Sequence, residues 1–185
     1  DFPGNTLKGD SCVVPVTGAD LYPTFLDMAG IPLMPGQHQD GVSLLPLLQG
    51  KSIPERALYW HYPHYGNQGG EPSSIIRQGD WKLIHYYEDG RDELYNLRID
   101  ETESEPLNVQ YPEKVEFLSK KLSVWLTEVG ARYPEPDPQY NPVAEALYKK
   151  KTRERMMKTL EATRKKQLGK DFKPNADWWG SETKD

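Results

Sequence analysis

Strand-like segments occupy the middle of the chain. Four short runs are rich in β-branched and aromatic residues, and the links between them contain Gly, Asn or Asp. Most of these links are too short for a parallel crossover, so neighbouring strands are expected to be antiparallel. In the link Asp89-Gly90 we expect both central residues to take positive φ, as in a tight hairpin. The predicted strands are residues 57–61, 73–77, 81–87 and 93–96.

Helical periodicity flanks these strands. Residues 20–29 carry apolar side chains at three- and four-residue spacings, and Gly30 is a typical stop. A short helix is expected within residues 40–50. From Pro112 to Gly130, apolar side chains repeat on one face, which predicts an amphipathic helix that covers one side of the sheet. The fold class is therefore α+β, with a roughly four-stranded antiparallel sheet.

The last part of the chain differs in charge. After a proline-rich connector, residues 143–168 permit a helix, and nine basic residues face two acidic ones between Lys149 and Lys166. The net charge of this segment is therefore +7. Because the net charge of the whole chain is −5, the rest of the chain carries −12. A solvated helix, or one that lies on an acidic surface of the same protein, is the favoured interpretation. The composition argues against nucleic acid as a partner, because the chain as a whole is acidic and no aromatic residue interleaves the basic ones.

The 185 residues are 36% hydrophobic, which is enough for a sizeable core, and they contain no apolar run that could span a membrane. The only cysteine, Cys12, lies in an apolar run and is expected to be buried. Gly-x-Ser-x-Gly and phosphate-loop motifs are absent from the sequence. Two close pairs of metal-ligand types occur, His38 with Asp40 and His61 with His64, and each supplies at most half a zinc site. We predict no catalytic and no metal residue.

One loop has an unusual composition. Residues 61–68 combine aromatic rings, two imidazoles and two amides between the ends of two predicted strands. This mixture suits a pocket wall that binds a polar, ring-shaped ligand such as a sugar. A packed structural loop is an equally good interpretation of the same residues.

Five segments of the chain carry recognisable motifs, in order: residues 15–31, 40–48, 56–65, 76–84 and 93–97. The first two match "D-x-x-P-T-x-L-x-x-A-G" and "D-G-x-S-L-x-P-L-L". Together the five segments resemble the motifs of the sulfatase family, and the resemblance covers about residues 10–142.

The resemblance implies an alkaline-phosphatase-like fold, of which this chain would be the C-terminal portion. Residues 1–50 would end the large sulfatase α/β domain, residues 51–142 would form the C-terminal subdomain, and residues 143–185 would be a basic helical tail. The chain opens at Asp1 without Met or an export segment, so we expect a piece of a longer polypeptide or a processed product.

The catalytic machinery that the resemblance implies is expected upstream. Sulfatases use a formylglycine, made from Cys or Ser in a "C/S-x-P-x-R" motif, together with calcium. The segment Cys12-Val13-Val14-Pro15-Val16 has neither the Pro nor the Arg at the required spacing. The resemblance therefore implies no catalytic residue, no metal site and no cofactor in this chain, which is expected to be inactive alone.

The resemblance also implies a role in closing one side of the substrate pocket. On that basis we expect His61 and His64 to contact substrate. Tyr65 and Asn67 are the next candidates. The implied partners are the N-terminal catalytic part of the same sulfatase and a sulfated carbohydrate or aryl sulfate, in a periplasmic or secreted setting. Two alternatives stay open: a non-catalytic binding module for acidic sugars or polyanions, and part of a related phosphate-ester hydrolase.

Overall fold

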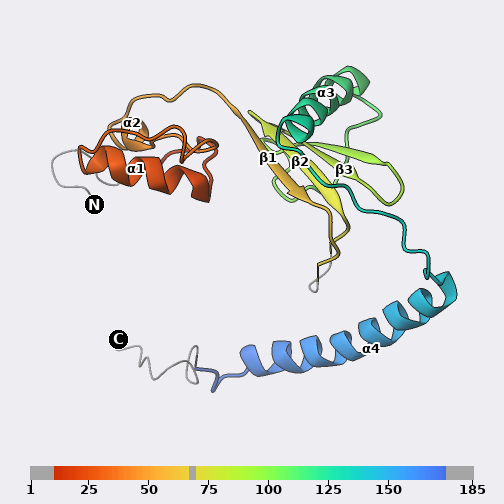
Figure 1. Cartoon of the computed structure of the whole chain (residues 1–185). Coiled ribbons are helices and arrows are strands. Elements are labelled where there is room, and N and C mark those ends of the chain that lie inside the picture. The colour runs from red at the N-terminus through yellow and green to blue at the C-terminus, as the bar shows by residue number, and fades with distance from the viewer. Residues whose placement is uncertain (1–10, 67–69, 174–185) are drawn as a thin grey trace. The chain divides into compact units, whose positions relative to one another are not determined.

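The computed structural model of the chain describes residues 11–66 and 70–173. Two compact units divide the chain, Asp1–Pro134 and Glu135–Asp185. The first unit holds the sheet and all the elements that precede or cover it, and the second holds one long helix (Figure 1).

A four-stranded meander forms the centre of the first unit. The strand order is β1-β2-β3-β4 and every pairing is antiparallel, so the predicted sheet is confirmed. The register aligns Tyr59 with Ile76, Ile76 with Leu83, and Leu83 with Leu94 across the sheet. Because side chains alternate between the two faces of a strand, these four residues share one face. The strands are β1 (Ala57–Tyr62), β2 (Ser73–Gln78), β3 (Trp81–Tyr86) and β4 (Asp92–Asn96).

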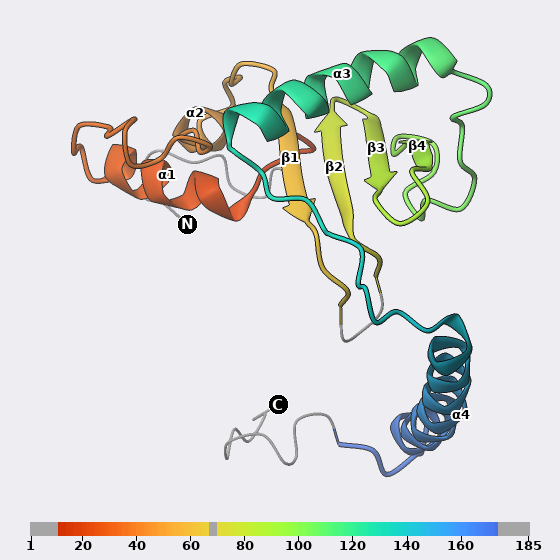
Figure 2. The same cartoon turned by 45° about the vertical axis from the view of Figure 1, so that its right-hand side comes forward.

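The amphipathic helix covers that face, as predicted. Helix α3 (Pro112–Glu128) lies across the sheet in Figure 2. Its buried leucines, Leu118, Leu122 and Leu126, are spaced four apart and so share one side of the helix. They pack with the fully buried Ile76, Leu83 and Leu94 of the sheet in one core cluster. The α+β class is thus confirmed.

The turn between β3 and β4 differs from the prediction. Gly90 has φ of 71°, but among the described residues Glu103 is the only non-glycine with positive φ, so Asp89 does not take the left-handed conformation. Instead, residues 87–91 form a longer loop. It is closed by hydrogen bonds from the Tyr86 amide to the Arg91 carbonyl and from the Gly90 amide to the Tyr86 carbonyl, both 3.0 Å. The extra residues remove the need for two consecutive positive φ values.

Helical elements precede the sheet. A 3₁₀ turn, η1 (Gly18–Asp20), leads into α1 (Leu21–Met28), and α2 (Leu45–Leu48) follows beside it. Cys12 is exposed, so the prediction of a buried thiol is wrong. It lies in an extended segment whose neighbour Val13 is 93% exposed, because the described part of the chain places no element over it.

The second unit contains the predicted basic helix, α4 (Pro142–Gln167), which has no buried residue. Its N-cap is Asn141, whose side chain accepts hydrogen bonds from the amides of Val143 and Ala144. Within the described ranges, no helix is long and apolar enough to cross a membrane.

Candidate functional site

The predicted contact residues lie where β1 leaves the sheet. His61 is half-buried near the end of strand β1, whereas His64 and Tyr65 are exposed in the loop that follows, Tyr65 by 61%. The imidazole of His64 packs edge-on against the ring of Tyr62, with ring centroids 5.5 Å apart. Asn67 lies outside the described residues. The loop therefore presents His64 and Tyr65 outward and turns His61 inward.

Both ring nitrogens of His61 have partners inside the fold. Nε2 lies 2.9 Å from the carbonyl oxygen of Arg132, and Nδ1 lies 2.7 Å from Oγ of Ser74. A carbonyl oxygen only accepts, so Nε2 donates to Arg132, and Nδ1 shares the second hydrogen bond with the Ser74 hydroxyl. The Tyr87 hydroxyl, 2.5 Å from Ser74 Oγ, completes a chain of three hydrogen bonds.

This pairing of Ser and His does not make a nucleophile. A catalytic serine must be reachable by the substrate as well as paired with a base. Ser74 is fully buried, and the second nitrogen of its histidine partner is occupied by a backbone carbonyl. The arrangement holds a strand end in place.

Aromatic rings surround this chain of hydrogen bonds. Tyr87 makes edge contacts with His61, His85 and Tyr133, with centroids 5.4 to 5.9 Å apart. Burial raises the pKa of the Tyr87 phenol, and its hydrogen bond with Ser74 only partly offsets this. On the outer side, Nδ1 of His85 lies 2.8 Å from Asp92, and this hydrogen bond raises the pKa of His85 despite partial burial.

Arg91 stabilises the end of the candidate loop that leads into β2. Its guanidinium lies 3.7 Å from the centre of the Tyr86 ring and pairs with Glu71 at 2.6 Å, just before β2. It also pairs with Asp89 and Glu93. The pKa of Arg91 is accordingly raised, first by Glu71 and then by Asp89. The exposed part of the loop is thus anchored through His61 on one side and Glu71 on the other.

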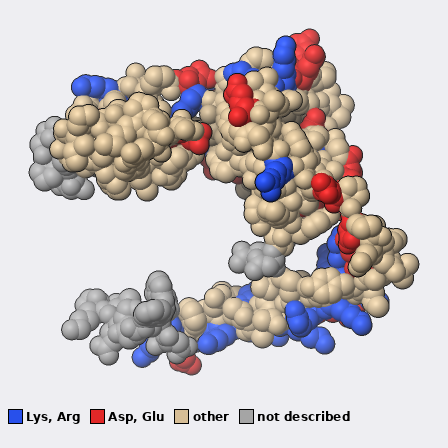
Figure 3. All heavy atoms as spheres, in the orientation of Figure 1, with Lys and Arg blue, Asp and Glu red and all other residues tan. Residues whose placement is uncertain are grey.

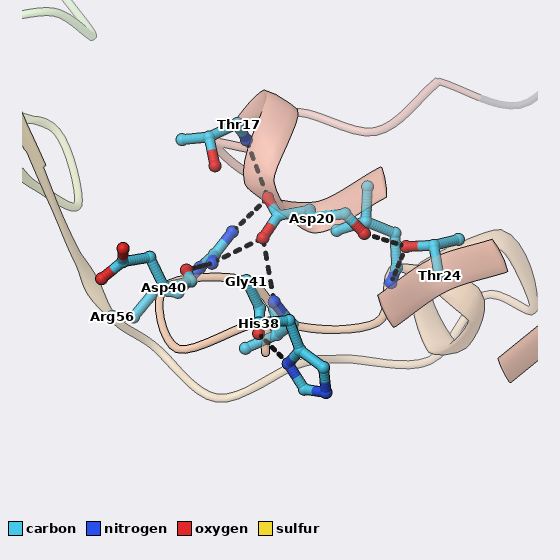
Figure 4. Close-up of polar contacts among 9 residues, drawn as sticks. Thr17, Asp20, Thr24, His38, Asp40, Gly41 and Arg56 are labelled. Carbon is cyan, nitrogen blue, oxygen red and sulfur yellow. Dashed lines mark hydrogen bonds and ion pairs between the residues drawn. The ribbon is translucent and has the colours of Figure 1, made fainter. Parts of the chain in front are cut away.

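A second polar cluster joins the helical region to the sheet (Figure 4). The carboxylate of Asp20 is fully buried and accepts hydrogen bonds from the amides of Thr17 and Val42 and two from the guanidinium of Arg56. Burial raises the pKa of the Asp20 carboxyl, but these hydrogen bonds, with Arg56 first, outweigh it and hold the pKa below its ordinary value. Asp20 therefore stays ionised.

The residues of the first two sequence motifs build this cluster. Thr24, also buried, donates to the Asp20 carbonyl and accepts from the Leu44 amide. Gly41 passes so close to the chain that a Cβ there would lie 2.1 Å from the carbonyl oxygen of Ala19. Three motif positions, Asp20, Thr24 and Gly41, are thus explained by contacts between the η1–α1 region and residues 41–44.

The pairing of Asp20 with Arg56 was not among the sequence-based predictions. The two residues are 36 positions apart, and only their places, at a helix start and before a strand, distinguish them from other charged residues. This ion pair connects α1 to the segment that enters β1, and through it to the candidate loop.

The other pair of metal-ligand types, His38 and Asp40, takes part in hydrogen bonds that stabilise a turn. Nδ1 of His38 donates to the Gly41 carbonyl at 3.1 Å, and the Asp40 carbonyl accepts from Arg56 at 3.3 Å. Across residues 11–66 and 70–173, no group of three His, Cys, Asp or Glu side chains could hold a metal ion. The described residues therefore do not fit calcium, and the Cys12 segment does not fit a formylglycine precursor.

A small pocket lies elsewhere in the first unit. It measures about 210 Å³ and is lined by Val14, Pro15, residues 53–56, Leu58, Arg77 and Gly79, none of which belongs to the candidate loop. Binding pockets usually measure about 300–1,000 Å³. This cavity is too small to be a complete sugar site.

Known proteins resemble most of the chain. A family model, described as N-sulphoglucosamine sulphohydrolase, C-terminal, matches residues 1–131. Arylsulfatase K of Mus musculus is 34% identical over 115 residues, which cover 58% of this chain and 20% of that protein. The N-acetylglucosamine-6-O-sulfatase of Bacteroides thetaiotaomicron is 35% identical over 145 residues, which cover 74% of this chain and 25% of that protein.

Solved structures of sulfated-sugar-related proteins also resemble part of the chain. A protein solved in complex with its substrate, D-glucosamine-2-N,6-O-disulfate, has a TM-score of 0.51 and 31% identity, and the match covers 65% of this chain and 25% of that one. A 2-O GAG sulfatase has a TM-score of 0.50 and 27% identity, covering 65% and 27%. The chain thus spans about a fifth to a quarter of the length of these relatives.

Proposed function

Because the chain belongs to the sulfatase family, as a C-terminal portion with the alkaline-phosphatase-like fold, we propose that it closes the substrate pocket of a sulfuric ester hydrolase. The family match over residues 1–131 is the observation that carries this proposal. The enzyme would act on sulfated carbohydrate, in keeping with relatives that are named for glucosamine and GAG sulfates.

The catalytic part would lie upstream and would supply the formylglycine and the calcium site. Residues 1–50 would end its large α/β domain, residues 51–142 would form the C-terminal subdomain, and residues 143–185 would be a tail. The setting would be periplasmic or secreted. This chain would contribute binding and orientation of the substrate, and no covalent step.

Exposed apolar side chains support packing against such a part. Large apolar residues before and within the α1 region are open to solvent, among them Val13 at 93% and Phe25 at 61%. Many exposed apolar side chains within one short stretch of sequence support an interaction site there. The other exposed members are Val14, Val16, Leu21, Tyr22, Ile31, Leu33 and Met34.

Within the loop we propose different tasks for the predicted residues. His64 and Tyr65 would contact the sugar, because an exposed imidazole can hydrogen-bond a sulfate or hydroxyl and an aromatic ring can cover an apolar sugar face. Asn67 would be a weaker candidate for the same contact. His61, with both nitrogens engaged, would act as a positioning residue that fixes the start of the loop.

Sulfate release by the chain joined to its natural upstream sequence tests the proposal. We expect His64→Ala and Tyr65→Ala to lower kcat/KM for glucosamine 6-sulfate at least about tenfold, and to leave 4-nitrophenyl sulfate turnover within about twofold, because that ester has no sugar. Phe117→Ala, which removes an exposed ring of α3, is the control and should change neither.

Three outcomes would contradict the proposal. Sulfate release by the 185-residue chain alone would show that it needs no upstream part. Equal losses of kcat/KM for His64→Ala and Phe117→Ala would show that the loop does not line the pocket. Faster cleavage of 4-nitrophenyl phosphate than of the sulfate would favour the phosphate-ester alternative.

A further inference from the structure

We propose that one face of α4 is a binding surface for a sulfated polysaccharide, the polymeric substrate of the enzyme. The identity of the polymer rests on the proposed function, whereas the surface itself follows from the helix. Helix α4 lies beyond the residues that match the family model, which end at 131.

The helix is exposed on all sides and is strongly basic. It has no buried residue, and Lys and Arg side chains crowd along it in Figure 3. Between Lys149 and Lys166, nine basic residues stand against Glu154 and Glu161. A helix of this composition gains no stability from a core in the second unit, so its side chains are available for another role.

Five of the basic residues form a stripe. At 3.6 residues per turn they fall within an arc of about 100° around the helix axis, and the stripe is about 22 Å long at a rise of 1.5 Å per residue. An extended polyanion that lies along the helix would meet all five. The stripe consists of Lys151, Arg155, Lys158, Lys165 and Lys166.

Most of the stripe is not neutralised. In the part of the chain that the structure describes, Lys165 is its only member with an ion pair, a long contact of 3.9 Å to Glu161. On the opposite arc, Lys149 pairs with Glu145 at 2.7 Å and Arg164 pairs with Glu161 at 2.8 Å. Across the described ranges, ion pairs thus engage two of the four basic residues outside the stripe, and one of the five within it.

The chemistry favours a sulfated polysaccharide over single-stranded nucleic acid or a membrane. Single-stranded nucleic acid binding uses aromatic rings as stacking platforms, and none occurs between Lys149 and Lys166. The apolar residues Met156, Met157 and Leu160 share their arc with basic residues, so the helix has no apolar face to insert into lipid. A dense row of sulfate groups needs only the row of cations.

Binding of a size-defined heparin decasaccharide to the 185-residue chain tests the surface at 50 and 200 mM NaCl. The stripe variant is Lys151→Gln/Arg155→Gln/Lys158→Gln, and the control is Lys149→Gln/Arg153→Gln/Arg164→Gln. Both lower the net charge by three. We expect the stripe variant to bind at least about tenfold more weakly, the control to change the Kd less than about threefold, and salt to weaken binding of the unmodified chain.

Several results would overturn the proposal that the stripe is a binding surface. Equal weakening by the two variants would mean that only net charge matters. Absence of heparin binding at 50 mM NaCl, or equally tight binding of a single-stranded DNA with the same number of charges, would do the same. Circular dichroism of both variants separates these results from a loss of the helix.

Turnover by the chain with its upstream sequence separates this proposal from the proposed function. We expect the stripe variant to keep the activity on glucosamine 6-sulfate and to lose at least about tenfold in kcat/KM on heparin. Unchanged heparin turnover, with His64→Ala still impaired, would overturn the polymer surface alone. If the unmodified protein binds heparin and the stripe variant does not, but neither releases sulfate, the proposed function and the identity of the polymer are overturned, and a polyanion-binding helix is left.

Discussion

Nε2 of His61 donates a hydrogen bond to the carbonyl oxygen of Arg132, 2.9 Å away, and so ties the end of β1 to the segment that follows α3. Nδ1 of the same ring is hydrogen-bonded to the buried Ser74 hydroxyl, 2.7 Å away. One side chain thereby connects three segments that are far apart in the sequence, at the base of the candidate loop.

Removal of both hydrogen bonds should destabilise the first unit. His61→Phe keeps a ring of similar size but removes the ring nitrogens that bond the Ser74 hydroxyl and the Arg132 carbonyl, so we expect a loss of about 1–3 kcal/mol in the free energy of unfolding. Urea denaturation followed by tryptophan fluorescence measures it. His64→Phe, at an exposed position, is the control and should stay within about 0.5 kcal/mol. Equal effects would contradict the positioning role of His61.

The ion pair between Asp20 and Arg56 should contribute more to stability than a surface pair. The Asp20 side chain is fully buried and that of Arg56 is 18% exposed, so Asp20→Ala leaves a half-buried cation unpaired. We expect a loss of about 3 kcal/mol. Asp20→Ala/Arg56→Met should cost less than the sum of the single changes, and a double-mutant cycle by urea denaturation measures this difference. Additive losses would show that the pair is not coupled.

The Asp20 carboxyl also gives stability a defined pH dependence. Its pKa in the folded chain is lower than the ordinary value of 3.8. The stabilisation is therefore fully present above about pH 3.8 and is lost as the pH falls through the lower, folded-state pKa. The stability difference between the unmodified chain and Asp20→Asn, taken from urea titrations at pH 3 and pH 6, should be larger at pH 6. A difference that grows toward pH 3 would contradict the assignment.

Local patterns in the sequence predicted most of the fold. The alternation in residues 57–96 and the four-residue spacing of Leu118, Leu122 and Leu126 require only neighbouring residues, and the sheet and helix follow them. The turn at Asp89 was predicted wrongly, because loop length is set by the pairing of Tyr86 with Arg91 and not by the dipeptide alone.

Long-range partners could not be predicted in the same way. The acceptor of His61 is a backbone carbonyl 71 residues away, and carbonyl groups carry no sequence signal. Burial of Cys12 was expected from its apolar neighbours, yet exposure depends on what packs over the segment. Composition identified the loop at 61–68, but only the positions of the side chains separate the inward His61 from the outward His64.

His85 should stabilise the sheet edge more at low pH. Its hydrogen bond with Asp92 raises its pKa above 6.5, so the stabilisation is fully present below about pH 6.5 and is lost as the pH rises through the raised pKa. The free energy of unfolding of the unmodified chain should exceed that of His85→Gln by more at pH 5.5 than at pH 8.5. Titration of His85 by NMR checks the direction, and a pKa below 6.5 would contradict it.

Gly41 should not tolerate any side chain. A Cβ at this position would lie 2.1 Å from the Ala19 carbonyl oxygen, so Gly41→Ala must separate α1 from the segment that carries Val42. We expect a loss of about 1–3 kcal/mol in the free energy of unfolding, together with faster hydrogen exchange at the Val42 amide. Gly18→Ala is the matched control, because nothing lies within 4 Å of its added Cβ. Similar losses for both would contradict the close approach.

Asn141 should control how well α4 forms. The helix has no buried residue, so its stability depends on its own backbone and capping, and the Asn141 side chain accepts from the amides of Val143 and Ala144. Asn141→Ala should cost about 1 kcal/mol and fray the first turns, whereas Asn141→Asp keeps an acceptor and should preserve the helix. Hydrogen exchange at the two amides measures the change directly. If heparin binds the stripe, it should restore part of the lost helicity, because the bound polymer favours the helical spacing of the cations; unchanged exchange in Asn141→Ala would show that the cap does not limit α4.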